Sequence, residues 1–143
     1  MKGGAEMVFG RHVLMELYGC RYKTLSDLDF VKKILIDLAT RLGSRILSEY
    51  FVRLNPGISG ILIIGESHIS IHTWPEKNYA SLDIYTCNTN SDLKQAILFI
   101  EEMFSPTQRS VLLVERGLPK GFRVSEIISN NPQVPEMVEP ARE

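Results

Sequence analysis

Two separate segments of this chain repeat apolar residues at the spacing of an amphipathic helix, and this pattern restricts the fold more than any other. The first apolar stripe follows Ser26, which we expect to cap the helix, and ends before Gly43, a common helix stop. The second follows the expected cap Ser91 and ends at Ser105-Pro106, because a proline disfavours helix in the residue before it. The stripes comprise Leu28, Val31, Leu35, Leu38 and Leu42, then Leu93, Ile97, Ile100 and Phe104. Each helix therefore needs an apolar surface to cover.

Most of the remaining sequence has the patterns of β-strands. We expect strands over residues 8–18, 45–54, 61–64, 67–74, 79–87 and 110–115. The segment 61–64 is wholly apolar between two glycines, which predicts a short strand buried on both faces. Residues 67–74 alternate instead, and Pro75 should end that strand. One face of it would carry Ser67, Ile69, Ile71 and Thr73, and the other His68, Ser70, His72 and Trp74.

These elements predict a fold of the α+β class. Their order is strand, helix, four strands, helix and strand, so we expect a two-layer sandwich, a largely antiparallel sheet with two helices on one face. Residues 1–129 would form a single domain, and residues 130–143, with three prolines and little core material, a loose C-terminal tail. The second face of the sheet would be left uncovered, which points to a partner subunit.

The composition argues against several classes of partner. The chain has 143 residues, with 16 lysines and arginines against 17 aspartates and glutamates. This balance gives no electrostatic reason to expect nucleic acid or a membrane surface as a partner. Two cysteines, Cys20 and Cys87, are too few for a disulfide framework, and no apolar run approaches the length of a membrane span. We therefore expect a cytoplasmic protein.

The segment from Glu66 to Glu76, ESHISIHTWPE, is the most unusual part of the chain, and its residue types admit several interpretations. A serine next to a histidine on a strand is most often plain polar surface. A metal shared by His68 and His72 is excluded on a strand, since four residues span about 13 Å and zinc ligands lie about 2 Å from the ion. A serine hydrolase is disfavoured, because no Gly-x-Ser-x-Gly motif surrounds Ser67.

Several further motifs accompany this segment. They are Gly-Ile-Ser-Gly at 57–60, Asp-Ile-Tyr-Thr-Cys at 83–87, Gly-Arg-His at 10–12, Leu-Tyr-Gly-Cys at 17–20 and Glu-Arg-Gly at 115–117. Together with ESHISIHTWPE, they closely resemble the prokaryotic S-adenosylmethionine decarboxylase proenzyme family. The resemblance covers roughly residues 9–117 and leaves the tail out. Because the central motif is long and rich in uncommon residues, the resemblance is specific.

The resemblance implies a chain that cleaves itself. Ser67 would attack the carbonyl carbon of Glu66 and convert the peptide bond into an ester, and removal of the Ser67 α-proton followed by β-elimination would break the chain. The products would be residues 1–66, the β chain, and residues 67–143, the α chain, whose new N-terminus becomes a pyruvoyl group. The family's pattern assigns His72 as the base of this processing and Ser59 as its support.

The resemblance also implies the reaction and the groups that serve it. The pyruvoyl group derived from Ser67 would be the cofactor, without a metal, and would form a Schiff base with the substrate amine before carbon dioxide leaves. From S-adenosylmethionine this gives the aminopropyl donor for spermidine and other polyamines. Cys87 would donate the returning proton, and Trp74 and Glu76 would bind the substrate, the latter at its ribose hydroxyls. A homodimer of processed units, with residues of both lining each site, is implied as well.

One position departs from the family's pattern. Where its members commonly carry a phenylalanine that stacks on adenine, this chain has Arg53; Phe51 lies two residues earlier on the same face of the expected strand and could substitute for it in substrate binding. A guanidinium is an unfavourable neighbour for a cationic sulfonium. The substrate therefore stays open between S-adenosylmethionine and, as the alternative, arginine or ornithine decarboxylated by the same chemistry.

A third possibility is an inactive homologue that regulates another decarboxylase. The joint presence of Ser67, His72 and Cys87 argues against it.

Overall fold

The computed structural model describes residues 8–65, 67–88 and 91–130 of the chain. Glu66, on the amino side of the expected cleavage site, and residues 131–143 of the expected tail lie outside the described residues. The helices are α1 (Tyr22–Leu25), α2 (Leu28–Arg41) and α3 (Leu93–Phe104), with a 3₁₀ turn η1 (Pro75–Lys77). The strands are β1 (Gly10–Tyr18), β2 (Ile46–Arg53), β3 (Ile58–Ile64), β4 (Ser67–Trp74), β5 (Tyr79–Thr86), β6 (Gln108–Leu118) and β7 (Gly121–Ser129). Among these helices, none has the length and apolar character needed to cross a membrane.

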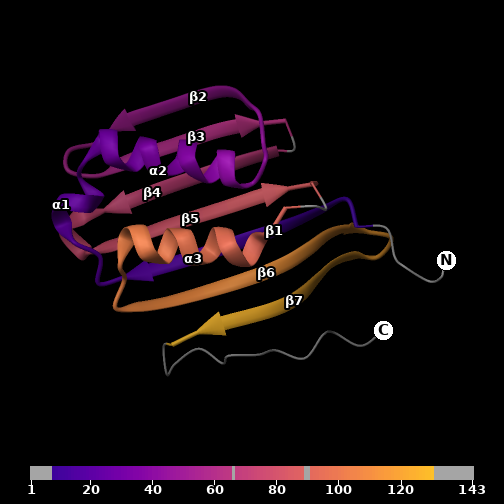
Figure 1. The fold of residues 1–143 in the computed structure, drawn as a ribbon. Coiled ribbons are helices and arrows are strands. Elements are labelled where there is room, and N and C mark those ends of the chain that lie inside the picture. The colour runs from indigo at the N-terminus through magenta and orange to yellow at the C-terminus, as the bar shows by residue number, and fades with distance from the viewer. Residues whose placement is uncertain (1–7, 66, 89–90, 131–143) are drawn as a thin grey trace.

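The strands form one seven-stranded sheet in the order β2-β3-β4-β5-β1-β6-β7, and each neighbouring pair is antiparallel. The two long helices, α2 and α3, lie on the same face of this sheet (Figure 1). The first strand of the chain, β1, lies between β5 and β6, so the middle of the sheet is held together by contacts between residues far apart in sequence. The predicted α+β sandwich with two helices on one face is therefore confirmed, with the short helix α1 as an addition.

Both long helices begin after an aspartate. Asp27 and Asp92 have extended backbones, and each carboxylate accepts a hydrogen bond from the backbone N–H three residues later. The prediction of Ser26 and Ser91 as the caps is wrong by one residue. Ser26 instead closes α1, and the hydroxyl of Ser91 donates to the carbonyl at the end of α2. Each serine is therefore already used by a neighbouring element, and the aspartate after it is left to cap the helix.

The hydrophobic core fills the space between the helices and the sheet. The apolar stripes of α2 and α3 face it, and every second residue of β1, β4 and β5 meets them from the other side. Fully buried members include Val13, Met15, Leu17, Val31, Leu35, Leu38, Ile69, Ile71, Leu82, Ile84 and Ile100. Each such side chain contributes about 1.5–3 kcal/mol by leaving water, so the core holds the strands in the register that forms the site.

Strand β3 alternates in burial, which corrects the expectation of a strand buried on both faces. Leu62 and Ile64 are buried against the helices, whereas Ile63 points the other way and is 41% exposed. The physical reason is that the helices cover only one face of an antiparallel sheet, so an apolar run does not bury both of its sides. Gly60 in the same strand makes room for the ring of Phe51, because a Cβ at Gly60 would overlap that ring.

The sheet ends with a strand that the sequence pattern does not predict. Strand β6 extends to Leu118, beyond the expected 110–115, and β7 pairs with it at the edge of the sheet. In β7 only Ser129 is buried. The segment therefore lacks the clear apolar alternation by which an inner strand is recognised.

Candidate active site

The sheet face opposite the helices carries the polar side chains of the central motif. The antiparallel register aligns Ser59 with His72 across β3 and β4, and it aligns His68, Tyr85 and His12 across β4, β5 and β1. Facing residues of neighbouring strands project from the same side, so these rows stand together on the uncovered face. The alternation predicted for residues 67–74 is confirmed from His68 onward.

One group of predicted site residues lines an open pocket of about 230 Å³ beside the turn between β2 and β3. Ser59, His72, Trp74 and Glu76 contribute to its wall, together with residues 54–57 of the turn. The Ser59 hydroxyl and His72 Nδ1 lie 2.8 Å apart, so these two predicted partners are hydrogen-bonded. Small-molecule sites typically enclose roughly 300–1,000 Å³, so one chain alone encloses a ligand of nucleoside size only in part.

Trp74 is held at the pocket by a column of stacked aromatic rings. Its ring stacks on Tyr79 with 5.0 Å between the centroids, and Tyr79 stacks on Tyr18 at 5.1 Å. The Tyr79 hydroxyl donates to Glu16 Oε2 at 2.6 Å, and burial together with this hydrogen bond raises the pKa of Tyr79 to about 12. Tyr79 therefore stays a neutral donor at physiological pH, and the column restricts the orientation of Trp74.

Phe51 and Arg53 lie on the helix-covered face of the sheet. The ring of Phe51 packs over Gly60, and the ammonium group of Lys32 in α2 lies 5.9 Å from the ring centre. Arg53 is exposed, and its guanidinium donates to the backbone carbonyl of Ser26 between α1 and α2. The pocket wall includes neither side chain. This placement puts the side chain of Phe51 and the charge of Arg53 outside the wall of this pocket, so the predicted contact between Phe51 and substrate stays a prediction.

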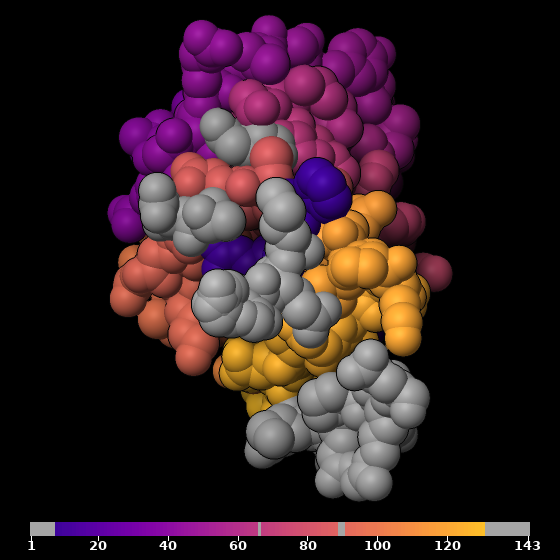
Figure 2. All heavy atoms as spheres, turned by 90° about the vertical axis from the view of Figure 1, so that its right-hand side faces the viewer, coloured from indigo at the N-terminus to yellow at the C-terminus, as the bar shows by residue number. Residues whose placement is uncertain are grey.

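A second group of predicted residues lies at the other end of β4. Ser67 is the first residue of that strand and pairs with Thr86, the last residue of β5, so Cys87 follows directly beside it. Cys87 is exposed, whereas Cys20 is buried, and burial raises the pKa of the Cys20 thiol to about 11. Figure 2 views the molecule from this end, where the start of β1 (indigo) lies between β5 and the β6–β7 hairpin (orange to yellow). The predicted nucleophile and the predicted proton donor are thus neighbours.

The backbone of Ser67 departs from strand geometry. Its φ is +148°, a region that residues other than glycine rarely adopt and that costs about 1–3 kcal/mol. Successive residues of a regular strand point to opposite faces, yet the Ser67 hydroxyl lies 3.2 Å from Nδ1 of the adjacent His68. This contact departs from the expected alternation, which placed Ser67 and His68 on opposite faces of the strand.

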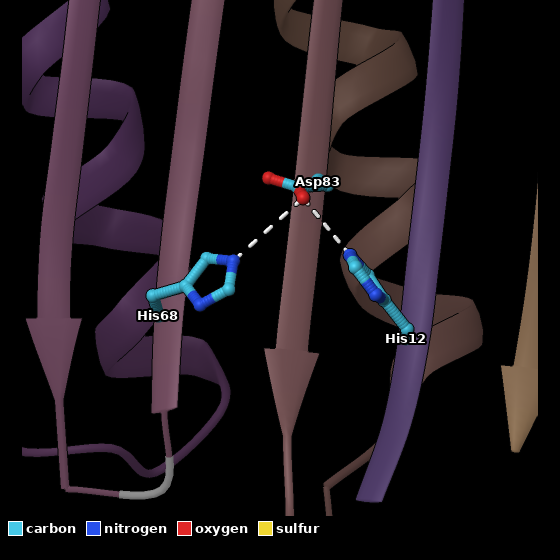
Figure 3. Close-up of side chains that lie close together, drawn as sticks. All are labelled: His12, His68 and Asp83. Atoms are coloured by element: carbon cyan, nitrogen blue, oxygen red, sulfur yellow. Dashed lines mark hydrogen bonds and ion pairs between the residues drawn. The ribbon is translucent and has the colours of Figure 1, made fainter. Parts of the chain in front are cut away.

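His12 from β1 and His68 from β4 both point at the carboxylate of Asp83, on the strand between them (Figure 3). His12 Nε2 lies 2.9 Å and His68 Nε2 lies 3.7 Å from Asp83 Oδ2, and the Ser70 hydroxyl donates to the other carboxylate oxygen. Burial acts to raise the pKa of Asp83. Hydrogen bonds from His12 and Ser70, together with the electrostatic attraction of His12 and His68, outweigh burial, so the pKa of Asp83 lies below its usual value.

The cluster of His12, His68 and Asp83 has the spacing of metal ligands, since its ligand atoms lie within 4.8 Å of one another. Arg116 opposes this use. Its guanidinium lies 3.2 Å from His12 Nδ1 and 4.2 Å from the centre of the Tyr85 ring. A guanidinium only donates, so His12 Nδ1 accepts, and in the neutral ring Nε2 carries the proton that faces Asp83. A metal ion at Nε2 would need that nitrogen unprotonated and the ring proton on Nδ1. The proton on Nδ1 would then face the positively charged guanidinium of Arg116.

The two groups of site residues are far apart within one chain. Ser67 and His72 lie five residues apart on β4, which corresponds to about 16 Å at ~3.3 Å per residue. Within one chain, the predicted processing base is therefore not beside the predicted nucleophile. His68, for which the sequence pattern indicated no role, occupies the place next to Ser67.

Known proteins are similar to this chain in both sequence and structure. A family model described as S-adenosylmethionine decarboxylase matches residues 11–117. This chain belongs to the S-adenosylmethionine decarboxylase family. The S-adenosylmethionine decarboxylase proenzyme of Syntrophomonas wolfei is 43% identical over 110 residues, which cover 76% of this chain and 87% of the relative. The proenzyme of Pyrococcus abyssi is 40% identical over 76% of this chain and 79% of its own length.

A solved structure supports the same conclusion. The crystal structure of the adenosylmethionine decarboxylase from Aquifex aeolicus matches with a TM-score of 0.72 and 29% sequence identity, over 79% of this chain and 93% of that chain. Both groups of site residues fall inside the segment that matches the S-adenosylmethionine decarboxylase family model.

Sequence reasoning did not find the cluster formed by His12, His68 and Asp83. His12 and Asp83 stand in two of the motifs that carried the family resemblance, and this was the one available signal. His12 and Asp83 are 71 positions apart, and only the insertion of β1 beside β5 brings them together. A pairing of this kind follows from sheet topology and has no signature in local spacing.

Proposed function

We propose that this chain is a self-cleaving, pyruvoyl-dependent decarboxylase of S-adenosylmethionine, cut between Glu66 and Ser67. The observation that carries the proposal is the placement of Ser67. A serine with an unfavourable backbone angle begins β4, with its hydroxyl beside a histidine and with Cys87 at the end of the neighbouring strand. Relatives that are 40–43% identical bear the name proenzyme, which agrees with a chain made as a precursor.

The cleavage chemistry uses groups that the chain itself supplies. Ser67 Oγ attacks the carbonyl carbon of Glu66, the peptide C–N bond breaks, and the acyl group moves from nitrogen to oxygen. Removal of the Ser67 α-proton then expels the ester carboxylate, which becomes the end of the first chain. The dehydroalanine left at position 67 takes up water and releases ammonia, so the second chain begins with a pyruvoyl group. Relief of the backbone strain at Ser67, about 1–3 kcal/mol, favours the break.

The surroundings of Ser67 suit the group it would become. When formed, a pyruvoyl carbonyl supplies an electron sink for the loss of carbon dioxide from a bound amino acid. Cys87 would hold the proton that returns to the substrate carbon, because it follows the strand end that pairs with Ser67 and is exposed there. A defined donor matters, since protonation at the wrong carbon would convert the pyruvoyl group into an amine.

The proposal includes a homodimer in which each active site uses residues of both copies. Within one chain the hydrogen-bonded pair of Ser59 and His72 lies about 16 Å along β4 from Ser67. The uncovered sheet face also exposes large apolar side chains, which marks an interaction surface. These side chains are Leu14, Tyr18, Tyr50, Ile63 and Trp74. Two such faces apposed about a twofold axis would bring the second copy's Ser59–His72 pair toward Ser67.

The pocket favours a nucleoside substrate. Trp74 offers a ring for the adenine or for the sulfonium, the latter a cation–π contact of about 0.5–2 kcal/mol. Glu76 offers two acceptor oxygens for a ribose diol. The guanidinium of Arg53 donates a hydrogen bond to the carbonyl of Ser26 and lies outside the pocket wall. Its charge therefore does not repel a sulfonium bound in the pocket. The product would serve as the aminopropyl donor for polyamine synthesis, and we place the enzyme in the cytoplasm.

A panel of three substrates tests the proposed activity. Release of carbon dioxide is measured from S-adenosylmethionine, arginine and ornithine with the wild-type protein, and with Ser67→Ala as the control that cannot form the pyruvoyl group. We expect turnover of S-adenosylmethionine alone, abolished in Ser67→Ala. Turnover of arginine or ornithine without S-adenosylmethionine would replace the substrate and keep the mechanism, and equal activity of Ser67→Ala would reject the mechanism.

A further inference from the structure

A continuous chain of contacts leads from the proposed nucleophile to the half-buried carboxylate of Asp83. The Ser67 hydroxyl lies 3.2 Å from His68 Nδ1, and His68 Nε2 lies 3.7 Å from Asp83 Oδ2. On the far side of Asp83, His12 Nε2 is 2.9 Å from the same carboxylate oxygen. Serine, histidine and aspartate therefore stand in the order that nucleophilic catalysis requires, with a second histidine supporting the acid.

The hydrogen-bond partners of Asp83 define where the protons sit. The guanidinium of Arg116 donates to His12 Nδ1, so neutral His12 presents an Nε2–H to Asp83. The Ser70 hydroxyl is a second donor to the carboxylate. Asp83 is then an acceptor that also faces His68 Nε2, and it favours the form of His68 in which Nε2 carries the proton. In that form Nδ1 has its lone pair directed at the Ser67 hydroxyl.

We propose that His68 is the base that removes the Ser67 hydroxyl proton when the chain cleaves itself, and that Asp83 positions it. The inference rests on the proposed self-cleavage. As the Ser67 O–H bond breaks, the proton moves to His68 Nδ1 and the oxygen forms a bond to the carbonyl carbon of Glu66. When the peptide C–N bond breaks, His68 returns the proton to the departing nitrogen of Ser67. The products are an ester and a free amine, and His68 is restored.

Self-cleavage needs two proton transfers from Ser67, the first from its hydroxyl and the second from its α-carbon, and different histidines would accept them. The hydroxyl proton of Ser67 is within hydrogen-bond reach of His68 in the same chain. His72 lies about 16 Å away along the strand, so it is available to Ser67 only from a second copy. Ester formation would therefore be complete within one chain, and the later removal of the α-proton would need the dimer.

Hydroxylamine distinguishes the two steps, because under mild conditions it cleaves esters and leaves peptide bonds intact. Full-length chains are made by cell-free synthesis and followed over time as wild type, Ser67→Ala, His68→Asn and His72→Ala. Asparagine keeps a polar group near the position of Nδ1 but does not accept a proton at neutral pH. We expect His68→Asn to split at least about 100-fold more slowly than wild type. We also expect it to resist hydroxylamine as Ser67→Ala does, while His72→Ala accumulates an ester that hydroxylamine cuts.

Two results would overturn the assignment. One is splitting of His68→Asn at the wild-type rate, and the other is an uncut His68→Asn chain that hydroxylamine cleaves, which would place its defect after ester formation. A wild-type chain that never splits would instead reject the proposed function. Circular dichroism and thermal unfolding of each variant show whether its fold is retained.

A second variant keeps the proposal testable if His68→Asn does not fold. Asp83→Asn preserves the shape of the side chain but donates to His68 Nε2, which favours the form of His68 with its proton on Nδ1. The Asp83→Asn variant should form the ester at least about 10-fold more slowly than wild type, and its uncut chains should resist hydroxylamine. Asp37→Asn, at the exposed Lys33 pair on α2, is the matched control and should split at the wild-type rate. Wild-type splitting of Asp83→Asn would remove Asp83 from the mechanism.

Discussion

Single side chains of this protein take their chemistry from contacts that the strand register provides. Ser67 lies beside His68 because its own backbone leaves strand geometry, and Cys87 lies beside Ser67 because their strands pair at that end. The motif indicated Ser67, His72 and Cys87 as the positions where chemistry is expected. The motif did not indicate that the Ser67 hydroxyl contacts His68, because that contact depends on the backbone angle of Ser67, which a sequence pattern does not contain.

The role of Cys87 is tested by removing its thiol. Cys87→Ala should still bind the substrate amine but should misplace the returning proton, so turnover falls and an aldehyde by-product rises with each cycle. The measurement is product analysis of S-adenosylmethionine reactions alongside the remaining pyruvoyl content. Cys20→Ala serves as the control at a buried thiol outside the site. Normal turnover and cofactor lifetime in Cys87→Ala would show that Cys87 is only a surface residue.

Asp83 should make the stability of the fold depend on pH. Burial opposes its charge, but hydrogen bonds from His12 and Ser70 outweigh burial and lower the pKa of Asp83. A lowered pKa means that the ionised form stabilises the folded state above the usual carboxyl value of about 3.9, and that this contribution is lost as the pH falls below it. The free energy of unfolding of wild type should therefore exceed that of Asp83→Asn near neutral pH.

That difference between wild type and Asp83→Asn should narrow as the pH falls below about 4. Urea unfolding at a series of pH values measures it, with Asp37→Asn as the exposed control. A difference that stays constant down to about pH 3 would contradict the lowered pKa of Asp83.

At the level of helices and strands, local signals located most elements but not all of their ends. The apolar stripes identified α2 and α3, because a helix that covers a sheet must repeat its apolar residues every turn. The predicted N-terminal caps were wrong by one residue at both helices. At each helix start a serine and an aspartate are adjacent, and only tertiary contacts decide which of the two side chains caps the helix. Strand β7 escaped prediction because its position at the sheet edge requires little burial.

The N-terminal cap of α2 gives a direct test at this scale. Asp27→Ala removes the acceptor for the backbone N–H of Phe30, so the free energy of unfolding should fall by about 1 kcal/mol. Ser26→Ala removes only a hydroxyl that donates to carbonyls of α1, which helix carbonyls tolerate well, and should cost about a few tenths of a kcal/mol. Chemical denaturation of both variants decides between them, and a larger loss for Ser26→Ala would restore the serine as the cap.

At the level of the whole molecule, the helices among the described residues cover only one face of the sheet, and the site residues of β3, β4, β5 and β1 stand on the other face. The sequence order predicted this uncovered face, because two helices pack on one side of a single sheet. The strand expected over residues 67–74 also implies the separation of Ser67 from His72, about 16 Å along β4. That separation is the reason for the proposal that two copies share each active site.

Complementation between two inactive chains tests the shared site. Ser67→Ala and His72→Ala should each remain uncut alone. When they are co-expressed, the His72→Ala chain should split in the mixed dimer, because its intact Ser67 meets the intact His72 of the other copy. Mass spectrometry identifies the cut chain by the mass change of the His72→Ala substitution. Co-expression of His72→Ala with the double variant Ser67→Ala/His72→Ala should give no splitting, and equal splitting in both mixtures would contradict a shared site.

The central claim is that the chain cleaves itself at one peptide bond, and intact mass under denaturing conditions tests it most directly. Purified wild-type protein should give two masses, one for residues 1–66 and one for residues 67–143 with a pyruvoyl group in place of Ser67. Ser67→Ala should give the mass of the uncut 143-residue chain. A wild-type chain that remains a single species after prolonged incubation, or that is cut at another bond, would contradict the account.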